Sequence, residues 1–228
     1  MAGKTHYYTP VLGKRIRVTP LDKCGRVDKT RKAVATNGFV SVSLSTQVES
    51  GTEITTRRAD GSLCVNERMS DSFKYFTVEI EFCGVNPALL ALVTNASEYK
   101  DAAQDVAGFK VAAGDIDKKF ALELWTGLAG QACQEGADEA SGYMLLPYIN
   151  AGVLGDVKVD GENAVTFSLT GAVTRSGNGW GKGPWKVVKT GEGQASELPT
   201  ALDPADHLLM IDTALAMPPS ATEPVTIA

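Results

Sequence analysis

The stretch SFKYFTVEIEFCGVNPALLALVTN, residues 72–95, decides the fold class. Polar residues separate the apolar side chains of its first half, which are Phe76, Val78, Ile80 and Phe82. This period of two is typical of a β-strand that buries one face. Asn86 followed by Pro87 then predicts an N-cap and a first helical position, so residues 87–94 should form a short helix. That helix would turn Leu89, Leu90 and Val93 inward.

Similar alternation along the rest of the chain predicts strands at residues 15–19, 38–45, 106–113, 119–126, 143–149 and 165–175. Residues 52–58 and 62–67 flank Ala59-Asp60-Gly61, a turn sequence that predicts a hairpin. The 228 residues include 23 glycines and 10 prolines, and only 21% are charged, which suits many strands and turns. The predicted fold is mostly β, a sandwich or barrel-like domain with one short flanking α-helix.

The length suits one β-rich domain with an ordinary core. We expect an N-terminal arm at residues 1–14, a single β domain at 15–212, and a flexible tail at 213–228, which is rich in Ala, Pro and Thr. The first ten residues contain no apolar signal segment, and the longest uncharged run, residues 140–155, is too short for a membrane helix. We therefore expect synthesis in the cytoplasm and no membrane partner.

The net charge of −5 is unevenly distributed. Residues 1–32 carry nine lysines and arginines against two aspartates, whereas the remainder carries thirteen cations against twenty-five acids. A generic nucleic-acid binder would not have so acidic a body. The basic segment could instead dock on the acidic body of a neighbouring molecule.

Catalytic chemistry is poorly supported. His6 and His207 are the only histidines and lie at opposite ends of the chain, which disfavours metal-dependent and Ser-His-Asp hydrolysis. Glu79 and Glu81 would share one face of a strand, roughly 7 Å apart, and could mimic a glycosidase pair. No aromatic sugar platform accompanies them, so a solvated or channel-facing strand is favoured. We expect no enzyme activity, no cofactor and no metal.

The glycine-rich run GNGWGKGPW, residues 177–185, lies between strands and does not open a helix, so it lacks the context of a phosphate cradle. A loop anchored by Trp180 and Trp185 is favoured. The four cysteines are far apart without a C-x-x-C pair; buried thiols are expected, with a disulfide or a metal cluster as alternatives. They are Cys24, Cys64, Cys83 and Cys133.

Two predicted strands have one face of short hydroxyl side chains, namely Ser41, Ser43 and Ser45 on the first and Thr166, Ser168 and Thr170 on the second. Burial of the other face would send Val40, Val42 and Leu44 into the core. Exposed sheet faces usually carry lysine and glutamate, so the short side chains hint at a smooth functional surface, with an ordinary outer face as the alternative.

Several long segments together resemble the major tail tube protein of long-tailed actinobacteriophages. They are RVTPLDKCG (17–25), GFVSVSLS (38–45), FTVEIEFCGVNPALLALVT (76–94), LELWTGL (122–128), GYMLLPYINAGVLGDV (142–157) and VTFSLTGAVTRSGNGWGKGPW (165–185). The likeness covers roughly residues 12 to 190 in unbroken order. These are packing and turn motifs, and none is a chemical signature.

The resemblance implies a virion subunit that forms hexameric rings, stacked into the tail tube through which DNA is ejected. Its partners would be further copies of itself, the tape measure protein and the terminator and tip proteins, after assembly in the host cytoplasm. DNA would pass without specific binding, and the chain ends too early for the additional C-terminal immunoglobulin-like domain of many relatives.

The lumen would be lined by Ser41, Ser43, Ser45, Glu79, Glu81, Thr166, Ser168 and Thr170. The hairpin and the N-terminal arm would reach neighbouring subunits through Arg15, Arg17, Arg57, Arg58 and Asp60. The alternatives are a free β-sandwich ligand-binding module, for instance one for carbohydrate, and an enzyme of unknown type.

Overall fold

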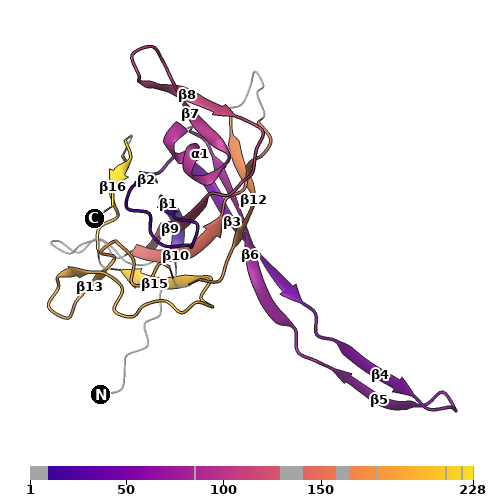
Figure 1. Ribbon diagram of the computed structural model, residues 1–228. Coiled ribbons are helices and arrows are strands. Elements are labelled where there is room, and N and C mark those ends of the chain that lie inside the picture. The colour runs from indigo at the N-terminus through magenta and orange to yellow at the C-terminus, as the bar shows by residue number, and fades with distance from the viewer. Residues whose placement is uncertain are drawn as a thin grey trace.

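The computed structural model describes residues 10–84, 86–128, 141–157, 165–177, 179–213, 215–221 and 223–227. These residues are mostly β-strand, and α1 (Pro87–Val93) is the only helix among them. The predicted mostly-β class with one short helix is confirmed. Figure 1 shows a compact body from which a long hairpin projects.

A ten-stranded antiparallel sheet forms the body, with strands along its main path in the order β16, β2, β1, β9, β10, β12, β6, β3. Two further strands join it, β11 beside β12 and β15 beside β10. Their bounds are β1 Pro10–Leu21, β2 Lys32–Thr36, β3 Phe39–Glu49, β6 Ser72–Phe82, β9 Lys119–Leu128, β10 Ser141–Asn150, β11 Val153–Leu154, β12 Phe167–Thr174, β15 Leu209–Thr213 and β16 Val225–Thr226.

The main core joins the two halves of this sheet. Apolar residues of β6 and β12 pack with those of β1, β2, β9 and β10, and α1 adds Leu89, Leu92 and Val93. Asn86 caps α1 by accepting hydrogen bonds from the backbone N–H groups of Ala88 and Leu89. The alternation in residues 72–82 therefore buries the predicted face, with Val78, Ile80 and Phe82 almost fully enclosed.

A second core lies on the opposite face of β1, β9 and β10. Residues that alternate with the main core, such as Trp125 on β9 and Tyr143 on β10, pack there against Trp180, Val187 and Leu198. The segment of residues 179–213 therefore covers this outer face. Trp180 and Trp185 anchor its first loop, as the sequence predicts.

Three hairpins extend from the body. The longest is built by β4 (Glu53–Arg57) and β5 (Leu63–Arg68), which continue outward from β3 and β6; we call residues 50–71 the arm (Figure 1). Its turn follows prediction: Gly61 has a φ of +85°, and Asp60 accepts hydrogen bonds from Ser62. The others are β7 (Ala96–Lys100) with β8 (Val106–Val111), and β13 (Val188–Lys189) with β14 (Ala195–Ser196).

The strands at the two ends of the described chain differ from those expected. β1 begins at Pro10 and not at residue 15, while residues 1–9 lie outside the described part. The C-terminal segment expected to fray pairs instead with β2 through β16, and Ile227 is only 4% exposed. The backbone N–H of Ala221 also donates to the carbonyl of Ala35. These backbone bonds and one buried isoleucine hold the segment although its sequence has no regular apolar period.

Two side-chain predictions are wrong. Val40 is 54% exposed because the register of β3 against β6 shifts between Phe39 and Ser41; the bulge turns Val40 outward, and Phe39 packs on the core in its place. Cys24, Cys64 and Cys83 are exposed free thiols, not buried ones, and Cys133 lies outside the described residues.

No helix in the described part is long and apolar enough to cross a membrane.

Candidate functional site

The predicted hydroxyl and carboxylate residues come together on one face of β3, β6 and β12. Glu81 of β6 lies opposite Ser41 of β3 on one side and Ser168 of β12 on the other. The next row pairs Glu79 with Ser43, and Ser45 faces Thr77 in the row after that. We call this set the polar face: Ser41, Ser43, Ser45, Glu79, Glu81 and Ser168.

The polar face is open to solvent, whereas the reverse side of its strands packs on the main core. Glu79 and the three serines of β3 are exposed, and Glu81 and Ser168 are half-buried. The neighbouring residues Val78 and Ile80 are buried in the main core on the other side of the same strands. Period-two geometry therefore fixes the direction of the polar side chains, because the apolar set admits only one orientation.

Thr166 and Thr170, which were predicted on the same strand as Ser168, lie at the margin of the polar face. The register between β12 and β6 shifts between Leu169 and Ala172, and Thr170 pairs with Val153 of β11. A Cβ at Gly155 would touch the side chains of both Ser168 and Thr170, so the β11 segment covers them partly. Thr166 is half-buried just before β12 begins.

The charge of the polar face is negative. Glu79 and Glu81 are its only ionisable members, and the remainder are hydroxyls with short side chains. The printed sequence places no lysine or arginine on β3, and the single lysine of β6, Lys74, forms a 3.2 Å ion pair with Glu49 near the arm. A polyanion close to this face would be repelled and would find no cation to hold it.

β3 also provides an open sheet edge. It pairs with β6 through ten positions, and its other side has no partner strand among the described residues. An 11-residue strand with an unpaired row of backbone groups is a template for another strand. The edge runs directly beside the serines of the polar face.

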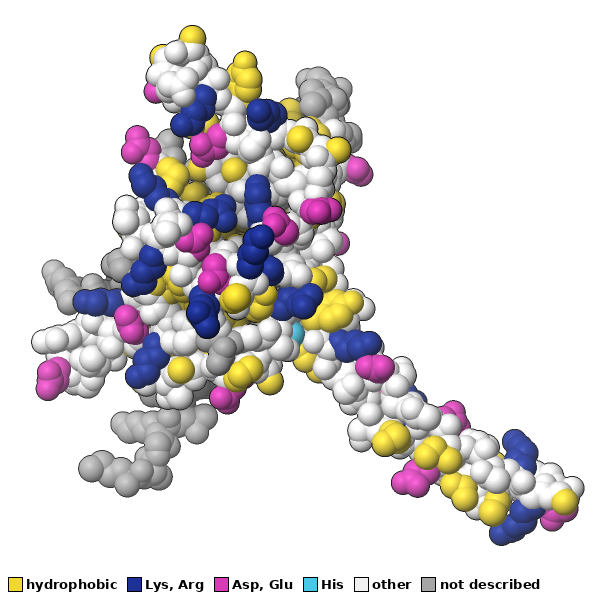
Figure 2. Space-filling view, viewed as in Figure 1, with side chains coloured by type: hydrophobic (Ala, Val, Ile, Leu, Met, Phe, Trp, Pro, Cys, Tyr) yellow, Lys and Arg dark blue, Asp and Glu magenta, His cyan; other side chains and the backbone are white. Residues whose placement is uncertain are grey.

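One side of the arm is more apolar than the other. Ile54, Leu63 and Val65 are exposed large hydrophobics of β4 and β5. Figure 2 shows hydrophobic side chains in a row along the arm. The predicted contact residues Arg57, Arg58 and Asp60 lie exposed at its tip, where Arg57 donates to the carbonyl of Gly61. The tip and the apolar row are thus both available for contact.

Arg17 corrects the predicted contact set. Its guanidinium binds both carboxylate oxygens of Glu123, each at 2.6 Å, and the residue is only 8% exposed. Tyr143 donates to the same carboxylate at 2.8 Å, and the guanidinium lies 4.0 Å from the ring centre of Trp185. Arg17 therefore stabilises the subunit's own second core and cannot reach a neighbour.

Burial raises the pKa of Tyr143 well above its ordinary value, and the charge of Glu123 raises it further. Tyr143 thus stays a neutral donor to the carboxylate. Arg15, two residues before Arg17 on β1, is half-buried with two guanidinium nitrogens enclosed, so it is not a free arm residue either. The signal that sequence reasoning missed is Glu123 itself, a single acid in the apolar strand LELW.

The described residues contain no group of three His, Cys, Asp or Glu side chains that could hold a metal ion. Compared with known proteins, the chain matches no protein-family model and no curated protein. The functional argument therefore depends on the geometry of the polar face, the open edge and the arm.

Proposed function

We propose that this chain is the structural subunit of a phage tail tube, in which hexameric rings stack and the polar face lines the channel for DNA ejection. The observation that carries the proposal is an acidic and hydroxyl-rich face, largely open to solvent, on three strands whose reverse side packs on the main core. In an isolated domain, lysines usually protect an exposed sheet edge from pairing with another chain. The polar face and the β3 edge beside it carry no lysine.

The polar face suits passage of DNA better than binding of DNA. A duplex carries about one charge per 1.7 Å of its axis, and proteins hold it through lysine and arginine. Carboxylates at Glu79 and Glu81 repel phosphates, and serine hydroxyls offer only short contacts. DNA would therefore slide without a preferred position.

Two further features support polymerisation. Pairing of the open β3 edge with a strand of a second copy would satisfy its backbone groups, and repetition around a closed ring would remove the edge altogether. The exposed apolar row of the arm would gain burial against another subunit. The tape measure, terminator and tip proteins would be the other partners, and the virion tail the location. No catalytic step or cofactor enters this function.

Negative-stain electron microscopy and light scattering of the purified chain over a range of concentrations test the proposal. Rings or hollow tubes are expected as concentration rises. A protein that stays monomeric up to high concentration and instead binds an oligosaccharide in a glycan screen would overturn it in favour of a free ligand-binding module.

A further inference from the structure

The loop between β1 and β2 presents a basic surface together with Lys32, the first residue of β2. We call residues 22–32 the basic loop; it contains five lysines and arginines against Asp22 and Asp28. Each aspartate is engaged in a turn, Asp22 with the N–H groups of Cys24 and Arg26, and Asp28 with Thr30. Lys23, Arg26, Lys29 and Lys32 are exposed, and no ion pair between described residues includes them.

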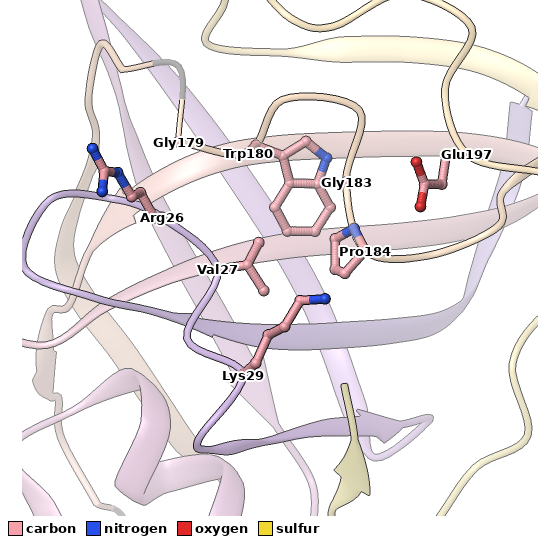
Figure 3. Close-up of a pocket in the computed structure, with 8 residues that line it drawn as sticks. All are labelled: Arg26, Val27, Lys29, Gly179, Trp180, Gly183, Pro184 and Glu197. Carbon is pink, nitrogen blue, oxygen red and sulfur yellow. The ribbon is translucent and has the colours of Figure 1, made fainter. Parts of the chain in front are cut away.

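A cavity of about 540 Å³ lies beside the basic loop. Arg26 and Lys29 line it together with Trp180, Pro184 and Glu197 (Figure 3). Trp180 is 5% exposed, and its indole N–H has no acceptor among the described residues. Figure 3 shows this nitrogen on the side of the cavity that holds the carboxylate of Glu197.

The cavity is preformed because two loops touch there through backbone alone. A side chain at Gly179 would collide with the carbonyl of Gly25, and Gly25 itself has a φ of +79° that favours glycine. The basic loop and the loop that carries Trp180 are therefore held close together at this point. Such a site fits a segment that combines carboxylates, for the two cations, with apolar side chains, for the indole and proline walls.

The same chain carries a segment of that composition at another place. Residues 98–117, which we call the acidic hairpin, include β8 and most of β7 and hold five acids against two lysines. Asp101, Asp105, Asp115 and Asp117 are exposed, and so are the large hydrophobics Tyr99, Val106 and Ile116. In Figure 1 the β7–β8 hairpin projects beyond α1, away from β13 and β15.

We infer that the acidic hairpin of one copy docks on the basic loop and the cavity beside it in the next copy. The contact is heterologous, because two different surfaces meet, and repetition of such a contact generates a ring or a helical stack. The inference deepens the proposed function and rests on it. The acidic hairpin and the basic loop, which are both separate from the polar face, would supply the charge complementarity that sets the direction of assembly.

Charge exchange tests the contact. In R26E/K29E the cavity loses both cations, and in D105K/D115K the acidic hairpin loses two acids; each variant alone should raise the protein concentration needed for assembly about tenfold or more. The chain that carries all four substitutions should regain assembly, and so should an equimolar mixture of the two variants by alternating contacts. Sedimentation velocity at low salt measures the assembled fraction, and circular dichroism with thermal melting checks the folded monomer.

The matched control is K100E/K110E, which inverts the same number of charges in the same direction but makes the acidic hairpin more acidic. It should assemble at least as well as the parent. Assembly of R26E/K29E at the parent's concentration, or loss of assembly in K100E/K110E as well, overturns the inference while the tube proposal stands. A parent chain that stays monomeric overturns both.

Discussion

The same sequence pattern, in which glutamate alternates with apolar residues, has opposite outcomes on two outer faces of one sheet. In β9 the run LELW places Glu123 on an outer face that residues 179–213 cover, and in β6 the run VEIE places Glu79 and Glu81 on an outer face that remains open. Glu123 is fully buried and bound by Arg17 and Tyr143, whereas Glu79 is exposed. Alternation therefore predicts which residues leave the core but not whether a second layer meets them.

The difference follows from where the partners lie in the chain. Arg17 and Glu123 are 106 residues apart and meet only because β1 and β9 are neighbours in the sheet. The covering layer is mainly loop, with the short strands β13, β14 and β15, so it has almost no periodic signal. A buried ion pair is tolerated there because two hydrogen bonds join the guanidinium to the carboxylate and Tyr143 donates a third to the carboxylate.

The largest expected effect tests the covered face. Arg17→Ala leaves the buried Glu123 carboxylate without its cation, and the free energy of unfolding should fall by about 3 to 5 kcal/mol. Arg57→Ala, which changes an exposed arginine on the arm, is the control and should change it by less than about 0.5 kcal/mol. Urea denaturation of the free subunit measures both. Equally small changes in the two variants would mean that the Arg17–Glu123 ion pair contributes nothing to the free energy of unfolding.

The open face is tested by reversing its charge. E79K/E81K should still assemble, because both side chains lie away from the core, but phage carrying it should deliver DNA less well, and more so at low salt where screening is weak. E79Q/E81Q keeps similar side-chain size without charge and should stay close to the parent. Unimpaired delivery by the lysine variant, or an assembled tube with both carboxylates on its outside, would contradict the channel assignment.

The same comparison shows which parts of the structure can be predicted from the sequence. Local signals were sufficient for β6, α1 and the arm's turn, where Asn86-Pro87 and Asp60-Gly61 act within a few residues. They were insufficient for β2, β7 and β16, which are too short to show a period, and for Val40, which a bulge reverses. The members of the polar face were predictable; the identity of Arg17 as a core residue required the β1–β9 register.

The arm should change most between free and assembled protein. Its residues are almost all exposed, and its two strands pair with each other and with no other described strand, so its amides should exchange quickly in the monomer. In the tube the apolar row would be buried and exchange should slow, while the amides of β9 should be protected in both states. Hydrogen exchange with mass spectrometry compares them. Equal protection of the arm in both states would exclude it from assembly.

The smallest expected effect is a pH dependence at the place where the covering segment meets the open sheet. His207 belongs to that segment; its Nδ1 lies 2.7 Å from the hydroxyl of Thr174 on β12, and its Nε2 lies 3.1 Å from that of Ser176. The Thr174 hydroxyl also accepts a hydrogen bond from the backbone N–H of Phe76, so it links the His207 ring to β6. Phe73, at the root of the arm, packs edge-on against the ring.

Burial lowers the pKa of His207 below its ordinary 6.5, because the charged ring would lose water. The unfolded chain then binds the proton more readily than the folded one. Stability from this group is accordingly present above pH 6.5 and declines as pH falls from there towards the lowered value. His207→Gln keeps polar atoms without titrating in this range, so its unfolding free energy should fall less between pH 7 and pH 5. Acidic groups elsewhere contribute equally to both proteins, and the difference between the two curves isolates His207. Parallel curves would show that the ring titrates alike in the folded and unfolded chain, and the junction would then impose no cost on its charge.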